Sequence, residues 1–253
     1  MPRLQAEAVE AMTRAFRRLE STITPPQKVD FRNSFVYRFA NKGIHEALLQ
    51  KLARNLSGLN AIAVLLDAGF VQEVGVLFRT LDEIQEDIIF LASAETNGAR
   101  TERHTQYLEA FYSEAIFSRP EGSLEIPKPN LVPRRKIWAH TMNALGQGIN
   151  ASQALAAGES ISTAYSGYVH AASANIMEMY GGDPPRFHVV GMRGTSRVAA
   201  CAKDAENYVY RGLMSTIIVA KAFGDASLVK ALYGFLAEYE SANNHRASAG
   251  SSA

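Results

Sequence analysis

The stretch VQEVGVLFRTLDEIQEDIIFL, residues 71–91, decides the fold of this chain. Its apolar residues recur at alternating steps of three and four: Val74, Leu77, Leu81, Ile84, Ile88 and Leu91. This spacing places them along one side of a helix, as a seam that packs against an antiparallel neighbour. Residues 44–68 carry a similar apolar face, and Gly69 suits a left-handed cap between the two helices. The sequence therefore predicts a helical hairpin at the centre of the protein.

The same helical period continues through most of the sequence. It predicts further helices over residues 3–20, 101–117, 160–180 and 196–223, and one after each of Pro133 and Asp225. No alternating strand pattern is found, although residues 187–192 suit a short extended segment. The sequence thus predicts an all-α protein, an antiparallel bundle of about seven to eight helices.

Composition places the chain among ordinary globular proteins. Apolar residues make up 47% and charged residues 20% of the sequence, and 253 residues are ample for one large core. We expect a single helical domain over residues 1–242, followed by a disordered tail of small and polar residues over 243–253. The net charge of +1 gives the chain as a whole no general attraction for nucleic acid or for anionic membranes.

The sequence also argues against several kinds of site and location. The single cysteine, Cys201, cannot form an intrachain disulfide, and no His-Glu-x-x-His or Glu-x-x-His motif predicts a metal site. No motif identifies a cofactor. The amphipathic N-terminus lacks the apolar region of a secretory signal. The apolar stretch 59–78 contains Asp67 and Glu73, so it does not suit a membrane span. We therefore expect a cytoplasmic protein without a membrane partner.

Four polar residues form the main candidate site: Arg79, Glu83, Ser166 and His170. Each pair lies one turn apart on its predicted helix, so each pair shares a helix side. A histidine is the natural acid or base near neutral pH, and Arg79 beside Glu83 suits an anion clamp with a carboxylate base. The alternative is a solvated face with weak ion pairs and a structural histidine. We expect Arg79, Glu83 and His170 to meet between the helices, because a buried arginine there needs a carboxylate.

Two further stretches have patterns that suit ligand binding. Residues 31–39 interleave four aromatic residues with two arginines: Phe31, Phe35, Tyr37, Phe39, Arg32 and Arg38. Such a stretch can stack nucleic-acid bases, but packing beneath the bundle is the preferred interpretation. The glycine- and arginine-rich loop 191–197 precedes a predicted helix, where free amide protons attract anions. An ordinary cap by Thr195 or Ser196 is the preferred interpretation of that loop.

Two segments together carry a resemblance: Leu65-Leu66-x-x-Gly69 … Leu77-x-Arg79-x-Leu81-x-Glu83, and Tyr165-Ser166-x-Tyr168-Val169-His170. This layout resembles a broad family of bacterial all-α proteins of unknown function, some of which are associated with abortive infection and phage defence. The resemblance spans roughly residues 44–223 and rests on few fixed positions. It implies that Arg79, Glu83, Ser166 and His170 act together, but it supplies no reaction.

A second resemblance selects other residues. Arg135 and His140 are separated by four residues, which is similar to the Arg-x(4–6)-His motif of the HEPN ribonuclease superfamily. That family is all-helical and cleaves RNA without metal at a site shared across a homodimer. The resemblance implies catalysis by Arg135 and His140, although the polar residue usual after the arginine is missing here. A basic first turn with a surface histidine is the alternative interpretation.

The sequence thus leaves three functions open. We expect a helical binding or defence-associated protein with an Arg/Glu/His polar site, and RNA or a small anionic ligand as its partner. The alternatives are a metal-independent ribonuclease of HEPN type and a structural oligomer without catalysis. A homodimer is expected because the seam over residues 71–91 and the small residues over 196–223 exceed what one neighbouring helix covers.

Overall fold

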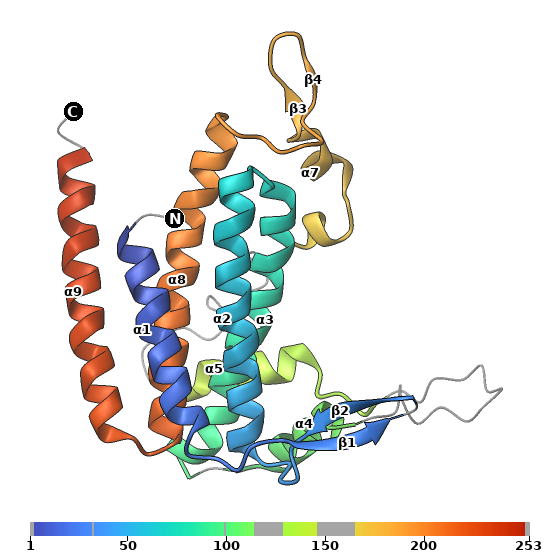
Figure 1. Cartoon of the computed structure of the whole chain (residues 1–253), viewed down its shortest axis with the longest axis vertical. Helices are drawn as coiled ribbons and strands as arrows, with labels where there is room; N and C mark the ends of the chain where they lie inside the picture. Colours follow the sequence, from blue (N-terminus) through green and yellow to red (C-terminus); the bar gives the residue numbers. More distant parts are fainter. Residues whose placement is uncertain (1–2, 32, 99, 114–128, 146–164, 251–253) are drawn as a thin grey trace.

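The computed structural model describes residues 3–31, 33–98, 100–113, 129–145 and 165–250. Within these ranges the chain is a bundle of long helices with two small antiparallel strand pairs, as Figure 1 shows. The all-α prediction is confirmed. No helix among these residues is long and apolar enough to cross a membrane.

Four long helices form the body of the bundle: α1 (Arg3–Glu20), α2 (Ile44–Ala68), α3 (Val71–Thr96) and α8 (Ser196–Ala222). Helix α9 (Ala226–Gly250) packs on α8 and α1. Helices α1, α3 and α8 run in one direction and α2 and α9 in the other (Figure 1). The shorter helices α4 (Glu102–Phe111) and α5 (Arg134–Leu145) pack on α3. Helix α9 continues to Gly250, past residue 243, where the sequence predicts a tail.

The predicted hairpin of α2 and α3 is confirmed, and its turn depends on one glycine. Gly69 has φ +82° and caps α2 in the left-handed conformation. Its carbonyl accepts a 2.8 Å hydrogen bond from the Met192 amide. A Cβ at this position would lie 2.6 Å from the Arg193 backbone nitrogen. Glycine is therefore required here both for the backbone angle and for the approach of the loop before α8.

The core fills the space between α1, α2, α3 and α8. Its largest fully buried side chains include Met12, Leu48, Leu59, Phe78, Leu81 and Ile88. Helix α8 approaches α2 so closely at Gly212 that a Cβ there would lie 2.7 Å from the Leu59 side chain. The small residues of α8 thus allow close packing against α2 within the same chain. They no longer argue for the expected homodimer, which remains a prediction.

The predicted continuous helix over 160–180 is wrong in its described part. Residues 165–169 are helical, but the chain turns at His170, and Ala171 has φ +51°. The short helix α7 (Ser173–Met177) follows, then the paired strands β3 (Tyr180–Gly181) and β4 (Arg186–Phe187). Ile176 is 37% exposed, although Gln72 of α3 donates to the carbonyl of the adjacent residue Asn175 at 2.8 Å. An apolar period that stays partly exposed supplies little of the packing that sustains a helix.

A β-hairpin lies in and before the aromatic stretch 31–39, where the sequence predicted no strand. Strands β1 (Gln27–Phe31) and β2 (Ser34–Arg38) pair antiparallel, from Gln27 opposite Arg38 to Phe31 opposite Ser34. Aromatic and β-branched residues occupy both faces of the pair, and the apolar–polar alternation in β1 covers only residues 28–31, which is a short signal. The short extended segment expected over 187–192 is wrong beyond its first residue, because β4 ends at Phe187 and residues 189–190 form a turn. Helix α4 ends at Phe111, and residues 114–117 of its predicted span lie outside the described residues.

Candidate functional site

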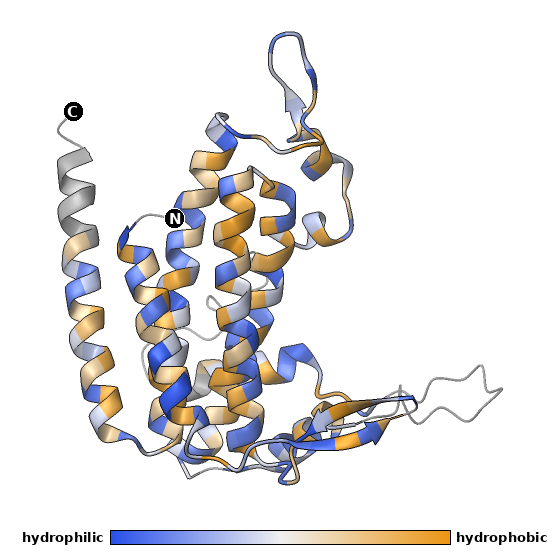
Figure 2. Ribbon diagram, in the orientation of Figure 1, coloured by the Kyte–Doolittle hydropathy of each residue, from blue (hydrophilic) through white to orange (hydrophobic). Residues whose placement is uncertain are grey.

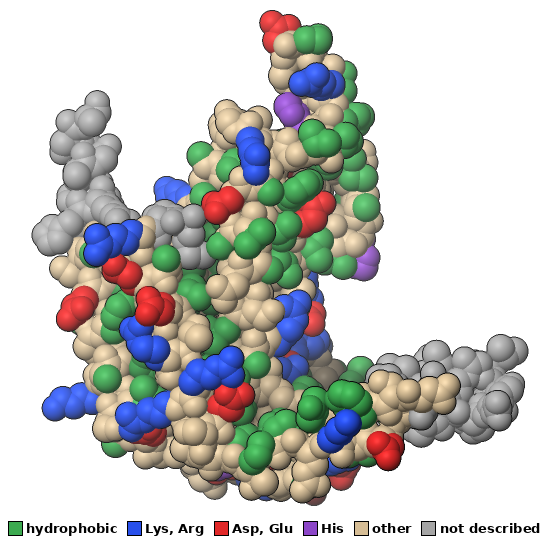
Figure 3. Space-filling view, viewed as in Figure 1, with side chains coloured by type: hydrophobic (Ala, Val, Ile, Leu, Met, Phe, Trp, Pro, Cys, Tyr) green, Lys and Arg blue, Asp and Glu red, His purple; other side chains and the backbone are tan. Residues whose placement is uncertain are grey.

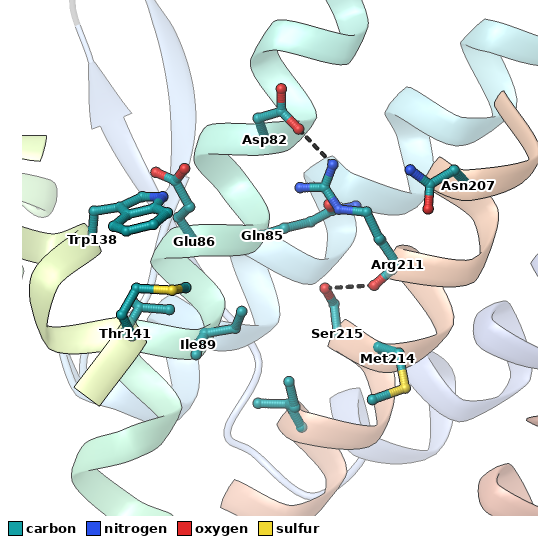
Figure 4. A pocket seen from close by; sticks show the side chains of 12 residues that line it. Asp82, Gln85, Glu86, Ile89, Trp138, Thr141, Asn207, Arg211, Met214 and Ser215 are labelled. Atoms are coloured by element: carbon teal, nitrogen blue, oxygen red, sulfur yellow. Dashed lines mark hydrogen bonds and ion pairs between the residues drawn. The ribbon is translucent and has the colours of Figure 1, made fainter. Parts of the chain in front are cut away.

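A cavity of about 300 Å³ lies between α3, α5 and α8 (Figure 4). Its polar lining consists of Asp82, Gln85, Glu86, Thr141, Asn207, Arg211 and Ser215, and its apolar lining consists of Ile89, Trp138, Met142, Met214 and Ile218. Helices far apart in sequence thus meet around one space. Small-molecule sites typically have this mixture of apolar walls and a few placed polar groups.

Asp82 is the charged centre of the cavity wall. Arg211 Nη1 donates to its Oδ1 atom at 2.7 Å, and the Tyr208 hydroxyl donates to the same oxygen at 3.1 Å. The other carboxylate oxygen, Oδ2, is buried and has no hydrogen-bond partner among the described residues, and Asp82 is only 4% exposed. A buried carboxylate with one bare oxygen keeps unused hydrogen-bond acceptor capacity.

Tyr208 is held in place for its bond to Asp82. Its ring stacks on Phe78, with centroids 4.1 Å apart and planes 6° apart. Burial raises the pKa of the Tyr208 hydroxyl, and the nearby Asp82 carboxylate raises it further. The hydroxyl therefore stays protonated and donates to Asp82.

Two more polar atoms of the cavity wall are buried without a partner. Gln85 Nε2 donates to Asn55 Oδ1 at 3.3 Å, but Gln85 Oε1 has no partner within the described part of the chain. The Thr141 hydroxyl on α5 is likewise unpartnered, and Thr141 is 1% exposed. A buried polar atom left unpaired costs about 1–3 kcal/mol. Three residues that line the cavity thus each hold one buried polar atom without a partner among the described residues.

Arg134 fixes α5 against α3 beside the cavity. Its guanidinium contacts the carboxylates of Asp87 and Glu86 and donates to the Glu83 carbonyl at 3.0 Å. Lys51 of α2 also reaches Asp87, at 2.8 Å. Burial raises the pKa of the Glu86 carboxyl, and Arg134 offsets part of that rise. This network sets the position from which Trp138 and Thr141, further along α5, face the cavity.

The main predicted site is brought together only in part. Arg79 Nη2 lies 2.7 Å from Glu83 Oε1, so the predicted ion pair is confirmed. Ser166 is half-buried and His170 is exposed at the turn that ends residues 165–169. Among the described residues no hydrogen bond joins His170 to Arg79 or Glu83. A site shared by all four remains a prediction.

The two residues of the alternative pair, Arg135 and His140, also lie in different environments. Arg135 is exposed, whereas the His140 ring packs against Phe90 and His104 and its Nε2 lies 2.8 Å from Ser93 Oγ. Burial lowers the pKa of His104 and of His140. His140 therefore belongs to a neutral, packed histidine cluster between α3, α4 and α5.

The sequence did not identify Gln85 and Thr141 as residues of a cavity, nor Arg134 as the residue that holds α5 against α3. Asp82 and Gln85 directly follow the seam residues Leu81 and Ile84, which is a signal for polar groups at the edge of a buried face. No comparable signal distinguishes Arg134 from its neighbour Arg135. Among the described residues no group of three or more potential metal ligands occurs.

Comparison of the chain with protein-family models, with curated proteins and with solved structures finds no match. The two resemblances drawn from sequence motifs therefore remain predictions, and the function is argued from the cavity.

Proposed function

We propose that this chain is a binding protein for a small molecule that carries an amino or amidino group, held between α3, α5 and α8. The observation that carries the proposal is the bare Oδ2 oxygen of Asp82, buried in the cavity wall. An ammonium or amidinium group would donate to it and gain a charge-assisted hydrogen bond. Gln85 Oε1 is a second acceptor, and the Thr141 hydroxyl can accept or donate.

The charges around the cavity favour a donor over the small anionic ligand that the sequence suggested. Arg211 is paired with Asp82 and Arg79 with Glu83. Arg134 is held by Asp87 and Glu86. An anion at any of these arginines would lie beside a carboxylate that already pairs with the arginine, and the two negative charges would repel. A cationic or neutral donor uses the acceptor atoms that have no partner.

The apolar lining defines the rest of the ligand. Trp138 and Met142 come from α5, and Met214 and Ile218 from α8. Aromatic and thioether side chains pack well against a flat apolar body. The cavity volume of about 300 Å³ lies at the lower end for ligand sites. Together these features suit a compact planar molecule with one donor-rich end.

Benzamidine and benzoate provide a direct test because they share a planar ring and differ mainly in the sign of the charged end. Trp138 is the single tryptophan of the chain and lines the cavity, so its fluorescence reports occupancy. We expect benzamidine to change Trp138 emission with saturation and to raise the melting temperature, because a ligand of the folded state stabilises it. Benzoate should do neither. A response to benzoate alone, to both probes equally or to neither would contradict the proposal.

A metal-independent ribonuclease of HEPN type is the second proposal, and we rank it lower. Its predicted histidine, His140, is engaged with Ser93, while Arg135 has no described bond to His140. Incubation of the purified protein with total RNA in EDTA, beside a His140→Ala variant, tests it. RNA cleavage that the variant loses would support this second function, and absence of cleavage would remove it.

A further inference from the structure

The β1–β2 hairpin presents two aromatic rings to solvent. Phe35 is 44% and Tyr37 is 59% exposed, and their rings meet edge to face with centroids 5.6 Å apart. As alternate residues of β2 they lie on the same face of the hairpin. Lys28, the strand partner of Tyr37, holds its Nζ 4.0 Å from the Phe35 ring centroid. The preferred interpretation from sequence, that these aromatics pack beneath the bundle, is therefore wrong for Phe35 and Tyr37.

A hollow of about 430 Å³ continues from Tyr37 toward the bundle. Arg38, Phe39 and Lys42 line its hairpin side, and Tyr112 lines its other side. The Tyr112 hydroxyl donates to the Gly43 carbonyl at 2.9 Å, which fixes that ring in position. The exposed rings and the hollow thus form one continuous surface.

The hairpin and the hollow together carry more basic than acidic residues. The described residues between 27 and 42 include three basic residues, Lys28, Arg38 and Lys42, and one acidic residue, Asp30, which is the strand partner of Phe35 and lies on the ring face with Lys28. The entire chain has a net charge of only +1, so this short segment carries a local excess. Figure 2 shows apolar residues along the hairpin, and Figure 3 shows hydrophobic side chains with basic and acidic side chains beside them on the arm at the lower right.

We propose that the β1–β2 hairpin and the hollow at its base bind single-stranded nucleic acid. Unpaired bases stack on Phe35 and Tyr37, and Lys28 and Lys42 contact the phosphates, with Arg38 beside them. Exposed aromatic rings interleaved with cations suit this ligand because every base has a flat face and every linkage a negative charge. A duplex hides its base faces, and an acidic peptide would use the cations but not the rings.

The second hairpin of the protein provides an internal comparison. Tyr180 and Phe187 on β3 and β4 are each 45% exposed, with ring centroids 4.9 Å apart. Between residues 180 and 187 the chain has one basic residue, Arg186, and one acidic residue, Asp183. This hairpin therefore presents a similar aromatic pair without excess charge, and its substitutions serve as matched controls.

Fluorescence anisotropy with a labelled oligouridylate of about 12 nucleotides tests the proposal. Simultaneous Phe35→Leu and Tyr37→Leu substitutions should weaken binding roughly ten-fold or more, since each stacked base contributes measurably. Lys28→Gln with Lys42→Gln should weaken binding and flatten its salt dependence. Three neutralised phosphates predict a slope of log K against log salt of about −2 for the unmodified protein.

The paired substitutions Tyr180→Leu with Phe187→Leu, and Arg186→Gln, should leave oligouridylate binding unchanged. All substituted side chains are exposed, so melting temperatures should stay close to that of the unmodified protein. Three results would overturn the proposal: no saturable binding at about 50 mM salt, equal affinity for a duplex of the same length, or binding that is indifferent to Phe35 and Tyr37 and is displaced by polyglutamate. The last result would assign the surface to acidic proteins.

Discussion

The Arg211 Nη1 atom lies 2.7 Å from Asp82 Oδ1 and so joins α8 to α3 at the wall of the cavity. Arg211 keeps 31% of its side chain exposed, whereas the Asp82 side chain is 6% exposed. The charge of Asp82 is thus held inside the protein mainly by this one partner and by the Tyr208 hydroxyl. The pair explains how a carboxylate can follow directly after Leu81 in a helix that is largely buried.

Removal of Arg211 should destabilise the protein strongly. Arg211→Met leaves the Asp82 carboxylate buried without its counter-charge, and we expect a loss of about 3 kcal/mol in the free energy of unfolding. The double variant Asp82→Leu with Arg211→Met should recover much of that loss, because no buried charge remains. Urea denaturation of the two variants measures both values. A double variant as unstable as Arg211→Met alone would contradict this account.

Arg134 should control the cavity through the position of α5. Arg134→Lys keeps the charge but loses the forked contacts to Asp87 and Glu86. We expect weaker benzamidine binding and a red shift of Trp138 emission, because α5 loosens from α3. Arg135→Lys, on the exposed neighbour, is the matched control and should change neither quantity. Equal effects of the two substitutions would show that α5 is not held by Arg134.

Substitution of Thr141 should raise stability and weaken ligand binding. Thr141→Val replaces a buried, unpartnered hydroxyl by a methyl group of similar shape, so the free protein should become more stable, by up to about 1 kcal/mol. The same substitution should weaken benzamidine binding measured by calorimetry. Thr216→Val is the control: Thr216 is fully buried, but its hydroxyl donates to the Gly212 carbonyl at 2.9 Å and it does not line the cavity. The Thr216→Val variant should be less stable than the unmodified protein and should bind benzamidine with unchanged affinity.

The histidine cluster should make the protein sensitive to mild acid. Burial lowers the pKa of His104 and His140 below the ordinary value of 6.5. Between these lowered pKa values and about pH 6.5 the unfolded chain binds more protons than the folded one. The free energy of unfolding is therefore highest above about pH 6.5 and decreases as the pH falls. The slope can reach about 1.4 kcal/mol per pH unit for each histidine. Urea titrations between about pH 5 and 8 measure it.

His104→Gln should flatten this pH dependence. The His104 Nδ1 atom accepts a 3.0 Å bond from the Thr101 amide, and its Nε2 donates to the Phe90 carbonyl at 3.0 Å. Glutamine fits the same capping position and does not titrate. His170→Gln, on the surface, controls for the loss of a histidine. An unchanged slope in His104→Gln would contradict the assignment of the acid sensitivity to this cluster.

The turn between α2 and α3 should tolerate only glycine. Gly69→Ala must adopt a left-handed backbone and also place its Cβ 2.6 Å from the Arg193 backbone nitrogen, so the loss should exceed about 2 kcal/mol. Gly98→Ala shares the positive φ, at +61°, but meets nothing within 4 Å. It should lose only about 1 kcal/mol. Similar losses for the two variants, measured by thermal denaturation, would rule out a role for the Arg193 contact.

The sequence determined those features that depend on neighbours within one or two helical turns. The steps of three and four over residues 71–91, the cap at Gly69 and the pairing of Arg79 with Glu83 are all local relationships. A helix repeats its geometry at every turn, so such relationships follow from spacing alone. This is why the α2–α3 hairpin and the all-α class were predictable.

Only the tertiary structure decided where these helices meet. Arg134 and Arg135 differ in direction by about 100° around α5, and the docking of α5 on α3 determines which of them is buried. In its described part the predicted helix over 160–180 is broken after Val169, and its apolar residue Ile176 stays 37% exposed. The cavity itself brings Asp82, Thr141 and Arg211 together from three separate helices. Spacing along one chain cannot encode that meeting, because it depends on how side chains of all three helices pack at once.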